Sequence, residues 1–108
     1  MKILITLSLL LSLSAHSLTG LKSGSEAPSI KVKDTEGKEI DLKNLKRPTA
    51  LIFYRGAWCP YCVKQLKSIE EEVASKTKGK ADLIGISVDS LKEASKMKKK
   101  MGLSYAVV

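Results

Sequence analysis

Histidine is almost absent from this chain, because His16 is the only one among 108 residues. It lies in a segment that we expect to be removed from the mature protein. A chain without histidine has no imidazole to act as a base or as a metal ligand. Cys–His proteases and Cys₂His₂ zinc sites are therefore excluded. We expect neither a bound metal nor another cofactor.

Arginine and aromatic residues are also scarce. Arg47 and Arg55 are the only arginines, and aromatic residues make up 5% of the chain. The formal net charge of +8 therefore comes from lysine, with clusters at residues 76–80 and 96–100. Nucleic-acid surfaces more often combine arginine with aromatic side chains that stack on bases. We expect solvated lysine faces and no nucleic-acid partner, while weak attraction to acidic partners stays open.

No apolar run is long enough for a membrane span, which needs roughly 20 residues. A shorter apolar segment covers residues 3–13 and follows Lys2, and the small residues Ala15 and Ser17 come next. This pattern is typical of a secretory signal peptide. We predict a signal peptide over residues 1–17, one domain over residues 18–108, and export to the periplasm or beyond the cell. An uncleaved anchor or a buried helix is the alternative.

The hydrophobic pattern of the first half predicts strands. Residues 18–29 are rich in serine and glycine and indicate a tether. Alternating apolar residues at 30–33 and 39–42 flank turn residues at 34–38, which predicts a β-hairpin. Residues 49–54 are almost continuously apolar, as in a strand that is buried on both faces.

Helices alternate with strands in the second half. We predict a helix over about residues 60–76, whose apolar face comprises Cys62, Leu66, Ile69 and Val73. A second buried strand is predicted over residues 81–88. A capping box at residues 90–93 opens another helix, which ends at Gly102, and residues 103–108 are extended. This order predicts an α/β fold with right-handed crossovers.

The two cysteines, Cys59 and Cys62, stand three residues apart where the first helix is predicted to begin. Residues at this spacing share one helical turn, so their sulfurs can form a bridge. The bridge closes a small ring and restricts the unfolded chain little, which suits a disulfide that opens and closes. A Cys-x-x-Cys pair after a buried strand favours redox chemistry. A structural disulfide, inert thiols and zinc shared in a dimer are the alternatives.

Helix position predicts unequal roles for the two sulfurs. Cys59 precedes Pro60, which suits the first helical position, so unpaired N–H groups at the helix start favour a Cys59 thiolate. Cys62 heads the inward-facing stripe, and we expect it to be more buried and to resolve the mixed disulfide. Trp58 and Tyr61 are expected to wall the site and limit water.

Arg55 has two interpretations of equal weight. Its charge could lie near the sulfurs, where it would favour the thiolate or attract an anionic substrate. It could also be an ordinary surface arginine. Backbone amides near Pro60 and Tyr61 could stabilise charge as well, as helix starts do.

Residues 51–62, Leu-Ile-Phe-Tyr-Arg-Gly-Ala-Trp-Cys-Pro-Tyr-Cys, resemble the active-site segment of peroxiredoxin-like proteins. These proteins form the alkyl hydroperoxide reductase C/thiol-specific antioxidant (AhpC/TSA) family of the thioredoxin-like superfamily. Residues 24–28, 34–38 and 85–90 resemble the family's N-terminal hairpin and its next strand and helix cap. The resemblance implies a thioredoxin-like fold with an N-terminal β-hairpin extension over residues 22–108, and a redox-active disulfide. The tetrapeptide at 59–62 is also that of glutaredoxin, and Trp58 before it resembles thioredoxin.

The sequence departs from these families at several positions. If Cys62 takes the peroxidatic place, Arg55 replaces the usual proline and Cys59 replaces the Thr or Ser that helps to bind peroxide. Phe53 replaces the buried acid of thioredoxin. No proline follows Pro60, although both families place a cis-proline later in the fold. The resemblance thus implies that the C-terminal strands and last helix are missing, as in a fragment, a truncated frame or a degenerate copy.

Three functional hypotheses follow. The first is an antioxidant enzyme that reduces peroxides through Cys59 and Cys62 and takes electrons from a thiol donor, such as a thioredoxin-like protein. The second is thiol–disulfide exchange with protein substrates, which the Trp-Cys-x-x-Cys motif favours. The third is a non-catalytic, truncated module. Helix position favours Cys59 as the attacking sulfur, whereas the family alignment favours Cys62.

Overall fold

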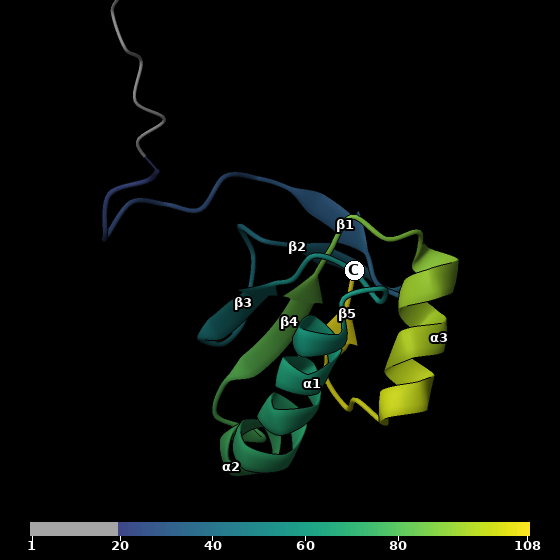
Figure 1. The fold of residues 1–108 in the computed structure, drawn as a ribbon. Coiled ribbons are helices and arrows are strands. Elements are labelled where there is room, and N and C mark those ends of the chain that lie inside the picture. The colour runs from purple at the N-terminus through teal and green to yellow at the C-terminus, as the bar shows by residue number, and fades with distance from the viewer. Residues whose placement is uncertain (1–19) are drawn as a thin grey trace, which may run out of the picture.

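The computed structural model describes residues 20–108, so the predicted signal peptide lies outside the described residues. Figure 1 shows the order of the elements. In chain order they are β1 (Lys31–Lys33), β2 (Glu39–Asp41), β3 (Thr49–Phe53), α1 (Pro60–Ile69), a π-helical segment (Glu70–Ala74), α2 (Ser75–Thr77), β4 (Asp82–Ile86), α3 (Leu91–Met101) and β5 (Ala106–Val107). Within this part of the chain no helix is both long and apolar enough to cross a membrane.

The predicted N-terminal hairpin is confirmed. Strands β1 and β2 are antiparallel, and Val32 lies opposite Ile40. The buried Asp34 stabilises the turn, because its Oδ1 accepts hydrogen bonds from the backbone N–H groups of Glu36 at 2.9 Å and Lys38 at 2.8 Å. The backbone N–H of Thr35 donates to the carbonyl of Val107 at 3.0 Å, which attaches the hairpin to the end of the main sheet.

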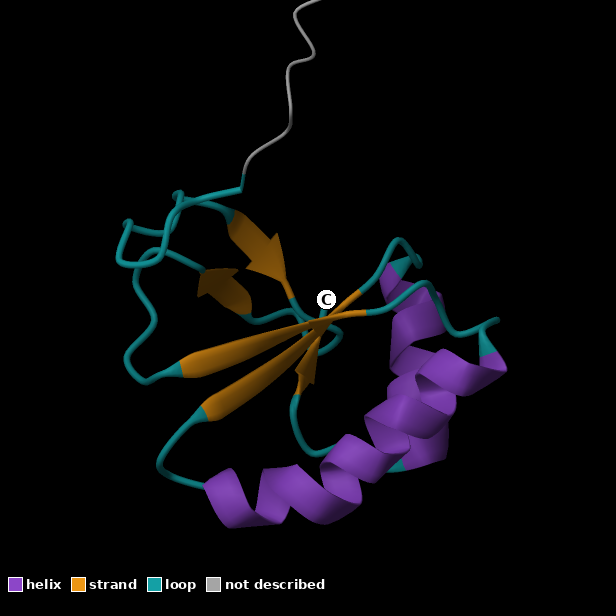
Figure 2. Ribbon diagram, turned by 60° about the vertical axis from the view of Figure 1, so that its left-hand side comes forward, coloured by secondary structure: helices purple, strands orange, loops and turns teal. Residues whose placement is uncertain are grey.

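The main sheet has the parallel strand order β3-β4-β5. The segment from α1 to α2 and the helix α3 lie on one side of this sheet, as Figure 2 shows. A single core fills the space between them, formed by Tyr54, Leu66, Leu83, Ala94, Met97, Leu103, Tyr105 and Val107. Because strands alternate with covering helices, the predicted α/β architecture is confirmed.

The prediction that residues 49–54 are buried on both faces is wrong. Ile52 and Tyr54 pack against the core, but the side chain of Phe53 is 73% exposed and that of Leu51 is 38% exposed. Strand β3 lies at an edge of the sheet, and the helices cover only one of its faces. The second predicted strand is shorter than expected, since it ends at Ile86 and leaves Val88 exposed in the following loop.

The long predicted helix is interrupted by a π-helical segment. Residues 60–69 form a regular α-helix, and Leu66 is fully buried as expected. The π segment that follows holds more residues per turn, so the 3.6-residue period no longer predicts which side chains face the core. Val73, expected on the apolar face, is therefore exposed.

The last helix has the predicted boundaries. The Ser90 hydroxyl caps its N-terminus and accepts a hydrogen bond from the backbone N–H of Glu93 at 3.3 Å. Gly102 ends it in the left-handed conformation with φ of 65°, which glycine adopts without a Cβ penalty. Ala94 and Met97 are buried on the face of this helix that packs against the core. The extended C-terminal segment is also confirmed, because β5 pairs with β4.

Candidate active site

The Cys-x-x-Cys motif lies where the chain leaves the sheet and begins its first helix. The last sheet hydrogen bond runs from the backbone N–H of Tyr54 to the carbonyl of Ile86 at 2.9 Å. The chain then turns, and the N–H of Cys59 donates to the carbonyl of Gly56 at 3.1 Å. Cys59 is the N-cap of α1, as predicted, and Pro60 occupies the first helical position.

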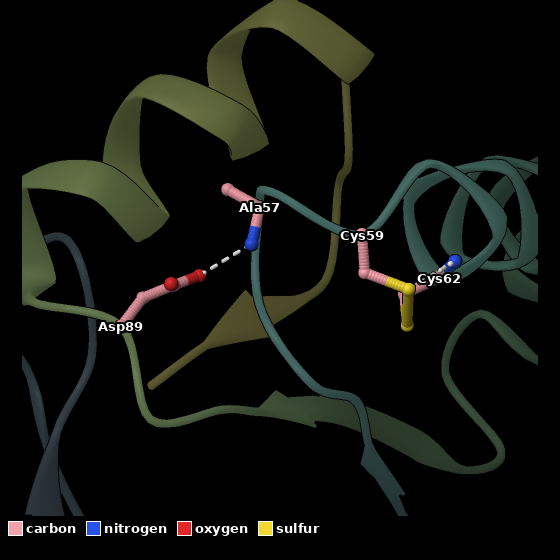
Figure 3. Close-up of a disulfide and its surroundings, with 4 residues drawn as sticks. All are labelled: Ala57, Cys59, Cys62 and Asp89. Carbon is pink, nitrogen blue, oxygen red and sulfur yellow. Dashed lines mark hydrogen bonds between the residues drawn. A yellow bond between two sulfur atoms is a disulfide. The ribbon is translucent and has the colours of Figure 1, made fainter.

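Cys59 and Cys62 are joined by a disulfide, with their Cα atoms 5.3 Å apart (Figure 3). The backbone N–H of Cys62 donates to the sulfur of Cys59 at 3.3 Å. Helix N-termini carry unsatisfied N–H groups and a partial positive charge, and both favour an anionic sulfur. The arrangement therefore supports a disulfide that, when reduced, leaves Cys59 in an environment suited to a thiolate.

The expected order of burial is reversed. Cys59 is only 7% exposed, whereas Cys62 is half-buried beside the core. Cys62 belongs to the first turn of α1, which projects into solvent with Pro60 and Tyr61 exposed. Helical periodicity identifies the side of a helix but not how far its end projects, so it could not predict this difference.

Trp58 and Tyr61 do not enclose the site as expected. Trp58 is 61% exposed and Tyr61 is 86% exposed, so both residues lie mostly in solvent. The guanidinium of Arg55 stacks over the Trp58 ring, 4.6 Å from its centroid, in a cation–π contact. This contact places the charge of Arg55 over the residue that precedes Cys59, and its role toward the sulfurs stays a prediction.

Asp89 is a site residue that the sequence analysis missed. It lies in the loop between β4 and α3, and its Oδ2 accepts a hydrogen bond from the backbone N–H of Ala57 at 2.7 Å (Figure 3). The N–H of Asp89 in turn donates to the Ser87 hydroxyl at 3.2 Å. The carboxyl ends of adjacent parallel strands lie at the same edge of a sheet, and this placement could have indicated Asp89.

Two buried tyrosines lie behind the motif. Burial raises the pKa of Tyr54, the Ser87 side chain offsets part of this effect, and the nearby Asp89 carboxylate adds to it. Burial also raises the pKa of Tyr105, whose hydroxyl donates to the carbonyl of Leu66 at 2.9 Å. Both phenols are therefore protonated at neutral pH and pack as neutral groups beneath the motif.

An open hollow of about 400 Å³ lies beside the motif, between the start of α1 and α3. Ala57, Trp58 and Asp89 line its end near the disulfide, and Met97 and Met101 contribute apolar surface. Among residues 20–108 no group of three or more His, Cys, Asp or Glu side chains is placed to hold a metal ion. The disulfide and Asp89 both lie at this edge of the sheet.

A cysteine pair that caps the helix after a parallel strand defines a thioredoxin-like thiol–disulfide protein. The chain belongs to the AhpC/TSA family, whose model matches residues 23–108. It is 30% identical over 89 residues to the chloroplastic peroxiredoxin Q of Oryza sativa subsp. japonica, covering 82% of this chain and 41% of that protein. It is 32% identical over 76 residues to a thiol-disulfide oxidoreductase ResA of Bacillus cereus, covering 70% of this chain and 44% of that protein.

Solved structures share the fold. The peroxidoxin BcpB of Mycobacterium tuberculosis superposes with a TM-score of 0.71 at 23% identity, over 82% of this chain and 59% of that one. The predicted thioredoxin-like fold with an N-terminal hairpin is thus confirmed for the described residues. The chain spans less than half the length of the two curated relatives described above.

Proposed function

We propose that this protein is a thiol-dependent oxidoreductase that reduces peroxides through Cys59 and Cys62. The observation that carries the proposal is the disulfide between these residues, with Cys59 capping α1, in a chain of the AhpC/TSA family. The similarity to a peroxiredoxin supports peroxide as the substrate.

The proposed cycle balances atoms and electrons in three steps. A thiolate attacks one peroxide oxygen, so that an S–O bond forms, the O–O bond breaks, and water or an alcohol leaves after protonation. The second thiol then attacks the sulfenic sulfur, which forms the disulfide and releases water. An external dithiol, such as that of a thioredoxin-like protein, reduces the disulfide and becomes a disulfide itself.

We assign the first attack to Cys59 because its sulfur lies at the helix start and accepts the N–H of Cys62. The family alignment would assign it to Cys62 instead. Cys59→Ser distinguishes the two assignments, since it places a hydroxyl where relatives carry Thr or Ser. If Cys62 attacks peroxide, Cys59→Ser still consumes one equivalent of peroxide without added reductant. If Cys59 attacks, only Cys62→Ser consumes that equivalent.

The test is peroxide consumption by the full chain with dithiothreitol as reductant, and dimedone labelling to locate the sulfenic acid. With dithiothreitol we expect Cys59→Ser to lose turnover and Cys62→Ser to keep it, because dithiothreitol reduces a Cys59 sulfenic acid directly. When pre-reduced protein reacts with peroxide in the absence of dithiothreitol, only Cys62→Ser should be labelled, at Cys59. The double variant Cys59→Ser/Cys62→Ser is the control for background consumption. Equal rates for the double variant and the unsubstituted protein would contradict the proposal.

Thiol–disulfide exchange with protein substrates is the second candidate. The exposed Trp58 and Tyr61 beside the motif favour it, because a protein partner could reach the disulfide there. Similarity to a thiol-disulfide oxidoreductase also supports it. Insulin reduction measured on the same variants separates the candidates: activity toward insulin without peroxide consumption would select exchange.

We also propose export to the periplasm or beyond the cell, on the pattern of residues 1–17. N-terminal sequencing of the protein recovered from its native host should show a start at residue 18 or 16. A retained Met1 would contradict export by a cleaved signal.

A further inference from the structure

We propose that Asp89 is a positioning residue for the redox pair, which acts by holding the turn that places Cys59 at the helix start. This inference rests on the proposed redox cycle of Cys59 and Cys62. Asp89 lies in the loop between β4 and α3, 32 residues from Ala57, which lies in the loop between β3 and α1. Its carboxylate therefore connects the loop after β4 to the loop that carries the motif.

The hydrogen bond to Ala57 secures the centre of this turn. Oδ2 of Asp89 lies 2.7 Å from the N–H of Ala57, a short bond with a charged acceptor. Two residues later the N–H of Cys59 closes the turn on the carbonyl of Gly56. Among the described residues, no other side chain hydrogen-bonds to the backbone of residues 55–58. Asp89 is thus the side chain that fixes this backbone from outside the turn.

Gly56 provides an independent observation of the same contact. A Cβ built at Gly56 would lie 2.8 Å from Oδ1 of Asp89 and would also overlap the indole of Trp58. The carboxylate therefore packs directly against bare backbone, at a distance that only glycine permits. One oxygen of Asp89 bonds the turn while the other lies against it.

The held turn should favour closure of the disulfide. In the equilibrium with glutathione, the protein dithiol and oxidised glutathione form the protein disulfide and two molecules of reduced glutathione. A Cys59 that the turn already holds in place loses less conformational freedom when the disulfide forms. Freeing the turn therefore shifts this equilibrium toward the dithiol. Any effect of the Asp89 charge on a reduced sulfur would act in the same direction, because a carboxylate disfavours a thiolate. An asparagine at this position separates the two effects, since it removes the charge and keeps an oxygen acceptor.

The experiment measures this glutathione equilibrium for the full chain and three variants. Asp89→Ala should lower the equilibrium constant for disulfide formation several-fold, up to about tenfold if the whole energy of one hydrogen bond to a charged group contributes to closure. Asp89→Asn keeps an oxygen acceptor and should stay within about twofold of the unsubstituted protein. Glu93→Ala is the matched control, since this exposed carboxylate lines the same hollow but makes no side-chain hydrogen bond within residues 20–108.

The outcomes are decisive whether or not the protein consumes peroxide, because the equilibrium requires no peroxidase activity. An unchanged constant in Asp89→Ala overturns the inference. Equal shifts in Asp89→Ala and Asp89→Asn overturn it as well, since charge rather than the hydrogen bond would then be responsible. If Asp89→Ala does not fold, amide exchange at Ala57 in the unsubstituted protein decides: a protected amide supports the inference and an unprotected amide overturns it.

Discussion

The position of one sulfur determines much of the chemistry proposed for this site. Cys59 is both the N-cap of α1 and one half of the disulfide. Pro60 makes the cap predictable from the sequence, because proline suits the first helical position. The contact between Asp89 and Ala57 joins residues far apart in the sequence, and local patterns do not reveal such a contact.

Two buried tyrosines offer a matched comparison of hydrogen bonding. The Tyr105 hydroxyl donates to Leu66, whereas the buried Tyr54 hydroxyl lies near the Ser87 side chain but has no partner at full hydrogen-bonding geometry among the described residues. We expect Tyr105→Phe to lower the free energy of unfolding by about 1 kcal/mol, and Tyr54→Phe to leave it unchanged or raise it. Urea denaturation at neutral pH measures both. Equal losses would contradict the assigned hydrogen bonds.

The same tyrosines should make stability depend on alkaline pH. Burial raises the pKa of both phenols in the folded state, while in the unfolded chain they ionise at about pH 10. Their contribution is fully present below about pH 10 and is lost as pH rises toward the folded-state pKa, because only the unfolded chain releases the protons. In a series of urea denaturations at rising alkaline pH, the fall in stability should be shallower in either Phe variant.

Among the elements, the π-helical segment is the one that periodicity could not predict. Residues 60–69 follow the 3.6-residue pattern, and a continued α-helix would have brought Val73 to the same face as Leu66. The structure instead directs Glu70 toward the loop before β5. Oε2 of Glu70 accepts hydrogen bonds from the N–H and the hydroxyl of Ser104 at 2.8 and 3.1 Å. A long-range contact of this kind leaves no periodic signal in the sequence.

Glu70 should therefore stabilise the packing of this segment against the chain after α3. We expect Glu70→Ala to lower the free energy of unfolding by about 1–2 kcal/mol, because it removes a charged acceptor from two donors. Glu72→Ala is the control, since Glu72 lies in the same π turn and its side chain makes no hydrogen bond or ion pair within the described part of the chain. Thermal denaturation compares them, and equal midpoints would show that the Glu70 contact is not stabilising.

For the molecule as a whole, the order of strands and helices was predictable but the burial of the sheet was not. Alternating strand and helix patterns indicated an α/β fold, and β3, β4, α1 and α3 lie close to their predicted positions. The apolar run at residues 49–54 is equally consistent with one covered face or two, because burial depends on what packs against each face. In the described residues both helices cover the same face (Figure 2).

Neighbouring residues of β3 provide a test of this one-sided covering. Ile52 packs against the core, whereas Phe53 points to the other face and is 73% exposed. Ile52→Thr should lower the free energy of unfolding by about 1–3 kcal/mol, because it removes buried apolar contacts and introduces a hydroxyl. Phe53→Thr should change it by less than about 0.5 kcal/mol, since an exposed ring loses little burial and threonine suits a strand.

Urea denaturation of the full chain measures both variants, and binding of an apolar dye reports the exposed face separately. Phe53→Thr should reduce dye binding, because Phe53 contributes the most exposed ring on that face of β3. A loss of stability in Phe53→Thr as large as that in Ile52→Thr would mean that the outer face of β3 is covered in solution. Dye binding that Phe53→Thr leaves unchanged would point to the same conclusion by an independent measurement.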